Sequence, residues 1–136
     1  MELVVDANII VSSLVATKGK TAETIFEEGM VLFAPEFLWG EVEKHWEEIL
    51  LKSKLPEADL RMALSLLFSP ITFISFSEYE PCLLPAQKIS PDPDDVAYFA
   101  VALKFHCPLW SNDKRLKKQG VVKVLSTSEI LKLVQE

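Results

Sequence analysis

Short apolar runs alternate along this chain with segments in which apolar residues recur every three or four positions. The runs predict buried strands at residues 3–5, 31–34, 71–76, 108–111 and 121–125. The helical spacing predicts helices at residues 7–16, 21–28, 35–51, 56–68, 92–105, 112–118 and 126–134, and it leaves 77–90 as the longest irregular segment. Strands that alternate with helices are typical of a parallel sheet covered on both faces, so we expect an α/β protein, a three-layer α/β/α sandwich.

Composition narrows the class of protein. The chain has 136 residues, of which 49% are hydrophobic, and we expect a single domain over residues 1–136. No apolar run approaches the roughly 20 residues of a membrane span, and the acidic N-terminus is unlike a signal peptide, so we expect a cytoplasmic protein without membrane contact. Cys82 and Cys107 lie far apart, which favours two buried free thiols over a disulfide or a zinc site.

The net charge of −6 argues against a protein that binds nucleic acid through a broad basic surface. It is compatible with an acidic pocket that holds divalent cations, which then meet phosphates. The candidate chemistry of this chain therefore lies in its carboxylates.

Two acids follow predicted strands. Asp6 ends the first strand, and Asp113 follows the fourth. If the strand order is 3-2-1-4-5, the order reverses between these two strands, and the acids face each other across the crevice where open parallel sheets bind ligands. The chain's two asparagines, Asn8 and Asn112, flank them and are candidates to orient a carboxylate or a metal-bound water. The alternative is that each acid only caps the helix that follows it.

The remaining acids have strong structural interpretations. Asp92 and Asp94 flank a proline at a helix start, which favours an N-cap and a complement to the helix dipole. Asp95 precedes the core-facing positions of that helix, so it is placed to point towards the sheet edge. Glu41 flanks the apolar stripe of its helix, where most acids are simply solvated.

Four segments of the chain, in this order and spacing, resemble the signature segments of the PIN-domain nucleases. The first pairs a strand with Asp6 and Asn8, and the second has its glutamate at Glu41, six residues after Pro35. The third has an acid before an alanine-rich helix at Asp95, with Asp92 as a possible helper. The fourth is a strand followed by Ser111, Asn112 and Asp113. The resemblance covers nearly the whole chain.

The resemblance implies a central, mostly parallel sheet and hydrolysis of single-stranded RNA that depends on Mg²⁺ or Mn²⁺, often by the toxin of a VapC-type toxin–antitoxin pair. Hard divalent ions neutralise charge on the phosphate and supply the nucleophile, which explains why such a site needs clustered acids. The implied roles are metal ligation by Asp6, Asp95 and Asp113, orientation of a metal-bound water by Glu41, and auxiliary contacts by Asn8, Asp92, Ser111 and Asn112.

Two further surfaces suggest partners. The densest basic run follows Asp113 and is a candidate to hold RNA phosphates; its alternative is a solvated helix end, and its members are Lys114, Arg115, Lys117 and Lys118. The helices at 35–51 and 56–68 carry more large apolar residues than one sheet obviously needs, which predicts a homodimer and a possible antitoxin contact. These residues are Phe37, Trp39, Trp46, Leu60, Met62, Leu64, Leu66 and Leu67.

Two other classes of function remain open. An aspartyl phosphotransferase would use Asp6 as its nucleophile, but the phosphatase pattern wants a second aspartate two residues on, where Asn8 stands. A non-catalytic binding or assembly module with the PIN fold would not need its acids. Metal-stimulated RNA cleavage separates the nuclease from both alternatives.

Overall fold

A five-stranded, all-parallel sheet in the order β3-β2-β1-β4-β5 forms the centre of the protein. The structure is a computed structural model, and it describes residues 1–16 and 19–135. The predicted strands and their order are confirmed, with the reversal between β1 and β4 where we expected it. The strands are β1 (Glu2–Val5), β2 (Val31–Pro35), β3 (Ile71–Ile74), β4 (Leu109–Trp110) and β5 (Val124–Leu125).

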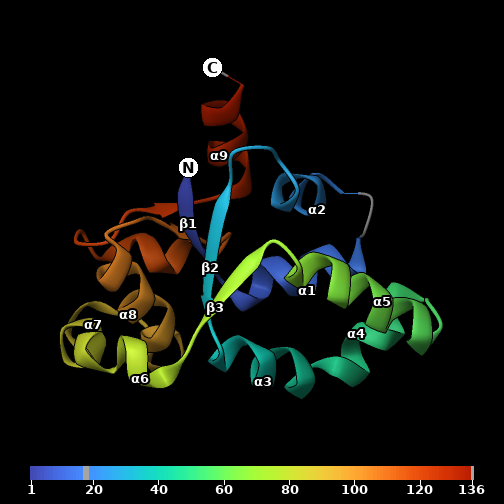
Figure 1. Cartoon of the computed structure of the whole chain (residues 1–136), viewed down its shortest axis with the longest axis horizontal. Helices are drawn as coiled ribbons and strands as arrows, with labels where there is room; N and C mark the ends of the chain where they lie inside the picture. Colours follow the sequence, from blue (N-terminus) through green and yellow to red (C-terminus); the bar gives the residue numbers. More distant parts are fainter. Residues whose placement is uncertain (17–18, 136) are drawn as a thin grey trace.

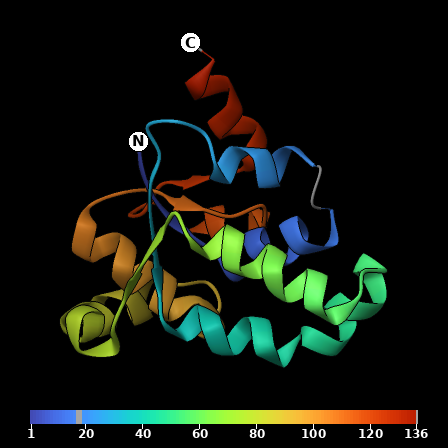
Figure 2. The same ribbon diagram turned by 45° about the vertical axis from the view of Figure 1, so that its right-hand side comes forward.

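Helices cover the sheet on both sides (Figure 1), as predicted for a three-layer sandwich. On one side, α1 packs against α3, α4 and α5; on the other, α8 packs on β1, β2 and β4, with α6 and α7 beside it. Figure 2 shows the same separation between residues 37–68 and residues 76–105. The helices are α1 (Ala7–Val15), α2 (Lys20–Ile25), α3 (Phe37–Lys44), α4 (Trp46–Ser53), α5 (Glu57–Phe68), α6 (Phe76–Tyr79), α7 (Leu83–Ile89), α8 (Val96–Phe105) and α9 (Thr127–Val134), with 3-10 turns η1 (Glu80–Cys82), η2 (Pro93–Asp95) and η3 (Lys114–Lys118).

The core forms where the central strand meets its two helical layers. Leu3, Val4 and Val5 of β1 are fully buried, as expected for a strand that helices cover on both faces. Across the sheet, the rings of Phe33 and Phe105 stack with centroids 4.2 Å apart, which ties β2 to the end of α8. The rigid layer that results holds the carboxyl ends of β1 and β4 in fixed positions.

The helix predicted at 35–51 is in fact two helices. At His45 the backbone leaves helical geometry (φ −102°, ψ 10°), so α3 ends there and α4 begins. The apolar spacing continues across the break, and for this reason the sequence pattern did not reveal it. The break lets Trp46 turn inwards, with the Arg61 guanidinium 3.8 Å from its ring centre. Trp46 is therefore buried, and its assignment to an exposed interface was wrong.

The segment at 77–90, predicted to be irregular, is mostly helical and packs against α8. Its prolines misled the prediction because both stand early in their helices, where no intrahelical N–H bond is lost. Pro81 lies in η1, and Pro85 is the third residue of α7. Tyr79 and Ala86 are the buried anchors of this segment.

Smaller differences concern element ends. The predicted helix at 21–28 ends at Ile25, and the predicted helix at 112–118 is a 3-10 turn that begins at Lys114. Both cysteines are free, as predicted, although Cys82 is only partly buried. In the described part of the chain, no helix is both long and apolar enough to cross a membrane.

Candidate functional site

The carboxyl ends of β1 and β4 lie side by side, and they carry the first two acids. Val5 pairs with Trp110, and the Asp6 N–H donates a hydrogen bond to the Trp110 carbonyl at 3.1 Å. Ser111 and Asp113 follow directly after β4. The chain thus enters the crevice from both strands at the point where the sheet order reverses, which is where parallel sheets bind ligands.

The Ser111 hydroxyl joins the two strand ends. It donates to Asp6 Oδ2 at 2.7 Å and accepts from the Asp113 N–H at 3.1 Å. The Asn8 amide Nδ2 also approaches it, at 3.4 Å. Ser111 is 1% exposed, so these contacts are made away from water and hold Asp6, Asn8 and Asp113 in one arrangement.

A cavity of about 710 Å³ opens above these residues. The four predicted catalytic acids, Asp6, Glu41, Asp95 and Asp113, all line it, although they come from four different segments. Asn8, Asp92, Asp94 and Arg115 line it as well. The structure therefore brings together every predicted acid of the site and one of the two asparagines.

Burial and mutual repulsion disfavour the charged forms of two of these acids. Burial, and then the charge of Asp6 and the other nearby aspartates, raise the pKa of Asp95 to about 7. Burial also raises the pKa of Asp6. The hydrogen bond from Ser111 and the nearby N–H groups at the start of α1 act in the opposite direction. The Asp6 side chain makes no hydrogen bond with the geometry of a cap on α1. The capping interpretation of Asp6 is therefore not supported. Among residues 1–16 and 19–135, neither carboxyl has an ion-pair partner within 4 Å.

Asp113 differs because it already has a cation. Arg115 donates from Nε to Asp113 Oδ1 at 3.1 Å and from Nη2 to Oδ2 at 2.8 Å. This pairing, with a hydrogen bond from the Arg115 N–H, holds the pKa of Asp113 below its usual range. The same N–H contact makes Asp113 the N-cap of η3, so its structural interpretation is confirmed alongside its place in the cavity.

Two auxiliary residues have mainly structural contacts. Asp92 Oδ1 accepts from the Asp94 N–H at 2.9 Å, which confirms the predicted cap, although Asp92 also lines the cavity. Asn112 was predicted to orient a carboxylate or a water; instead its Oδ1 accepts from the Thr127 N–H at 2.8 Å. That contact fixes the start of α9, and Asn112 does not line the cavity, so its auxiliary role stays a prediction.

The basic run after Asp113 contributes less to the cavity than its sequence position indicated. Of its four members, only Arg115 lines the cavity. Lys117 is paired with Glu129 of α9, and Lys114 and Lys118 do not line the cavity. The charge of Lys118 nevertheless helps to lower the pKa of Asp113, so Lys118 also lies near the acids, and phosphate binding by this run stays a prediction.

Sequence reasoning missed two lysines on the opposite wall. Lys44 and Lys52 line the cavity from α3 and α4, together with His45 and Glu48. The available signal was their spacing from Glu41, because positions three to four apart along a helix share a face.

Two buried polar atoms at the cavity have no hydrogen-bond partner in the described protein: Asn8 Oδ1 and the Tyr98 hydroxyl. An unsatisfied buried polar group costs about 1–3 kcal/mol, so such groups are usually satisfied by water or a ligand. Burial and the nearby acids Asp6, Glu41 and Asp95 raise the pKa of Tyr98, so its hydroxyl stays a donor. Both atoms therefore indicate that the cavity binds water or a polar ligand.

The fit of a divalent metal depends on donor chemistry. Within residues 1–16 and 19–135, no group of three or more His, Cys, Asp and Glu side chains is arranged to hold a metal ion as it stands. The donors that line the cavity are nevertheless carboxylate oxygens, which Mg²⁺ and Mn²⁺ prefer, and Asp6 and Asp95 lack a compensating cation. The residues therefore fit a hard cation, provided that Asp113 exchanges Arg115 for it.

Comparison with known proteins agrees with this architecture. A similar fold occurs in the crystal structure of VapBC2 from Rickettsia felis bound to a DNA fragment from their promoter, with a TM-score of 0.67 and 13% sequence identity over 93% of this chain and 98% of the other. A search among curated proteins gave no match. The family model described as "PIN domain" matches residues 4–134, and this match, which extends from β1 to the last turn of α9, shows that the chain belongs to the PIN-domain family.

Proposed function

We propose that the protein is a metal-dependent endoribonuclease that hydrolyses phosphodiester bonds of single-stranded RNA. The observation that carries the proposal is the convergence of Asp6, Glu41, Asp95 and Asp113 from four segments into one cavity at the reversal of strand order. Membership of the PIN-domain family supports the same function. A role restricted to helix capping would not explain why these acids share one cavity, in which burial and then the charges of Asp6 and other nearby aspartates raise the pKa of Asp95 to about 7.

In this proposal the four acids have different roles. Asp6, Asp95 and Asp113 hold Mg²⁺ or Mn²⁺, which supplies an activated water and neutralises charge on the phosphate oxygens when bound. Glu41 lines the cavity from α3 and orients the attacking water by accepting its hydrogen bond. Arg115, released from Asp113, is then free to contact a phosphate oxygen at the cavity mouth. Asn8 and Ser111 keep Asp6 in place.

We further propose that the protein is the toxin of a toxin–antitoxin pair. The structurally similar VapBC2 is a complex of two proteins with promoter DNA, and the match covers nearly all of both chains. An antitoxin would restrain a nuclease whose open cavity otherwise acts on cellular RNA. A processing nuclease without an antitoxin is the alternative that expression in cells distinguishes.

Self-association is proposed through an apolar surface formed by α3, β3 and α5. Trp39 packs against Phe73 with ring centroids 5.3 Å apart, and Phe68 packs against Phe73 at 5.0 Å. Trp39, Met62 and Leu66 leave 46%, 68% and 58% of their surface exposed. Exposed large apolar side chains next to a packed aromatic cluster are typical of an interface. Of the sequence-based interface residues, Leu60, Leu64 and Leu67 are instead buried in the core.

The central prediction concerns Asp6. Purified protein should cleave a single-stranded RNA only with Mg²⁺ or Mn²⁺, and Asp6→Asn should lower the rate by at least about 100-fold, since one electrostatic group in such sites contributes about that much. Gel analysis of a labelled RNA measures it. The control Asp59→Asn, an exposed acid on α5, should cleave like wild type. Equal cleavage by Asp6→Asn would place the activity elsewhere, or in a contaminant.

The acid cluster also predicts how stability depends on pH. Unfolded Asp95 has an ordinary pKa of about 3.9, whereas the folded pKa is about 7. Its contribution to stability is therefore fully present below about pH 4 and is lost as the pH rises through about 7. In metal-free protein, the melting temperature of Asp95→Asn minus that of wild type should increase over this window.

Metal should reverse that trend, because it binds the charged cluster of the folded state. At neutral pH, millimolar Mn²⁺ should raise the melting temperature of wild type. At a hundredfold excess of Mn²⁺ over Kd, the free energy of unfolding should increase by about 2.7 kcal/mol. The gain should be smaller in Asp95→Asn. A pH-independent difference between the two proteins, or no response of wild type to Mn²⁺, would contradict the proposed cation site.

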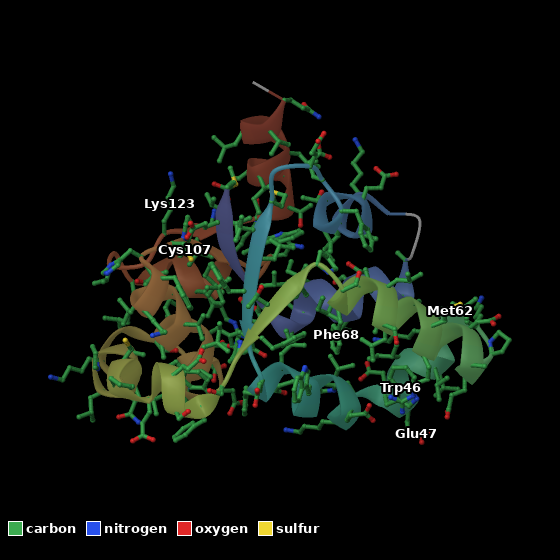
Figure 3. All side chains as sticks on the ribbon, viewed as in Figure 1. Trp46, Glu47, Met62, Phe68, Cys107 and Lys123 are labelled. Carbon is green, nitrogen blue, oxygen red and sulfur yellow. The ribbon has the colours of Figure 1, made fainter. Side chains whose placement is uncertain are left out.

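The proposed dimer is tested by measuring the molecular mass of the protein in solution. Wild type should be a dimer in light scattering at micromolar concentration, and the double variant Trp39→Ser, Leu66→Ser should be a monomer with its fold intact. Figure 3 shows Met62, on the same helix as Leu66, at the periphery of the molecule. Leu84→Ser removes an exposed leucine of α7 and should leave the dimer unchanged. A monomeric wild type would contradict the proposed dimer.

The toxin role predicts growth arrest on induced expression. Wild type should stop growth while Asp6→Asn, at equal protein level, should not, because only the former cleaves RNA. Growth curves and immunoblots of the two strains measure this. Normal growth with active nuclease would leave the enzyme with a cellular task other than that of a toxin.

A further inference from the structure

The cavity does not end at the acids but continues as a groove between α1 and α4. Its α1 wall is formed by Asn8, Val11, Ser12 and Val15, whose spacing places them on one face of the helix. Its α4 wall has the same spacing, at His45, Glu48, Ile49 and Lys52. We call this part of the cavity the α1–α4 groove.

The groove leads away from the acids. Both α1 and the pair α3–α4 run in the same direction from the sheet (Figure 1), and α1 begins beside Asp6. The rise from Asn8 to Val15 is about 10 Å. A stacked nucleic-acid strand advances about 3.4 Å per nucleotide, so the groove is long enough for roughly three nucleotides.

Cations appear along the α3–α4 wall of the cavity. The end beside the sheet carries Asp6, Asp95 and Asp113, whereas on the opposite wall Lys44 lies three residues after Glu41 and Lys52 lies further along α4. One acid, Glu48, also lies there, and Lys52 neutralises it through an ion pair of 2.7 Å. Lys44 has no ion-pair partner among the described residues.

The floor of the groove is apolar. Val11 and Val15 of α1 are half-buried and offer a surface without hydrogen-bonding groups, while Ile49 of α4 is buried beneath the cavity lining. An apolar surface that alternates with cations matches a strand whose bases are unpaired, because bases then pack on the floor while phosphates stay near the cations.

We propose that the α1–α4 groove binds the nucleotides next to the scissile phosphate of a single-stranded RNA. Lys44 and Lys52 contact phosphates at different positions along the strand, and Val11 and Val15 pack against a base. The inference rests on the proposed function, since the scissile phosphate must lie at the acid end. It replaces the basic run at 114–118 as the main RNA-binding surface. An acidic peptide in the same groove is the competing occupant.

Binding in EDTA tests the groove without cleavage. Fluorescence anisotropy with a labelled single-stranded RNA octamer should show roughly fivefold weaker affinity for Lys44→Ala, Lys52→Ala than for wild type. The slope of log affinity against log salt should fall in magnitude by about 1.4, or about 0.7 for each lost phosphate contact on a single strand. Both lysines are exposed, so the variant should keep the melting temperature of wild type.

A charge-matched control removes two lysines outside the groove. Lys88 and Lys123 do not line the cavity, and Figure 3 shows Lys123 on the opposite side of the molecule from Trp46 in α4. Lys88→Ala, Lys123→Ala should leave the salt slope at the wild-type value. Equal effects of the two double variants, or an effect of Lys114→Ala, Lys118→Ala alone, would overturn the proposal. Tighter binding of a labelled polyglutamate peptide than of RNA would assign the groove to a peptide.

Turnover separates this inference from the proposed function. On RNA with Mn²⁺, the groove variant should show a raised KM and a nearly unchanged kcat, because neither lysine is among the groups proposed to hold the metal or to orient the attacking water. Bis(p-nitrophenyl) phosphate has no neighbouring nucleotide. On this substrate the groove variant should lose at least severalfold less of its kcat/KM than it loses on RNA. RNA binding that depends on the two lysines, without any hydrolysis, would refute the proposed nuclease activity and support RNA binding in the α1–α4 groove. Hydrolysis that does not depend on the lysines would support the nuclease activity and refute RNA binding in the groove.

Discussion

The Ser111 hydroxyl is the contact on which the site depends. It reaches Asp6 after β1 and the Asp113 N–H after β4, two strands that neighbour each other only because the sheet order reverses there. Both contacts are nearly free of water, so a partner left without its hydrogen bond would carry a desolvation cost of about 1–3 kcal/mol. The geometry of the acids therefore follows from the pairing of β1 with β4, and that pairing is held by the core on either side.

The same arrangement concentrates negative charge in a poorly hydrated place. In the structure this repulsion is only partly compensated, because Arg115 pairs with Asp113 and not with Asp6 or Asp95. Asp95 and Asp6 are left with raised pKa values. Stability must then come from elsewhere: from the buried faces of β1 and α8, and from the capping box of Ser126 and Glu129 at the start of α9. By itself this charge arrangement destabilises the folded state, and the proposed cation would offset that cost.

Sequence reasoning predicted those features that depend on local pattern. The strands, their order and the placement of Asp6 and Asp113 follow from apolar runs and from where such runs end. It failed where a side chain has a partner distant in sequence. Asn112 bonds to Thr127, and Lys117 pairs with Glu129, both from α9, and nothing near 112–118 signals this. The segment 77–90 failed for a different reason, because a proline early in a helix looks the same in sequence as a proline that prevents one.

The break at His45 shows how one unpredicted backbone feature serves several surfaces. A continuous helix would carry Leu38, Val42, Trp46 and Ile49 on one straight stripe, and the break instead lets each half bury its own pair of them. The side chains beside the break, Lys44 and His45, are thereby left facing the cavity. Trp39 lies on another face of α3, against Phe73 of β3. The helix pair thus separates the cavity from the exposed apolar surface, so that two copies joined through that surface would keep both acid sites open.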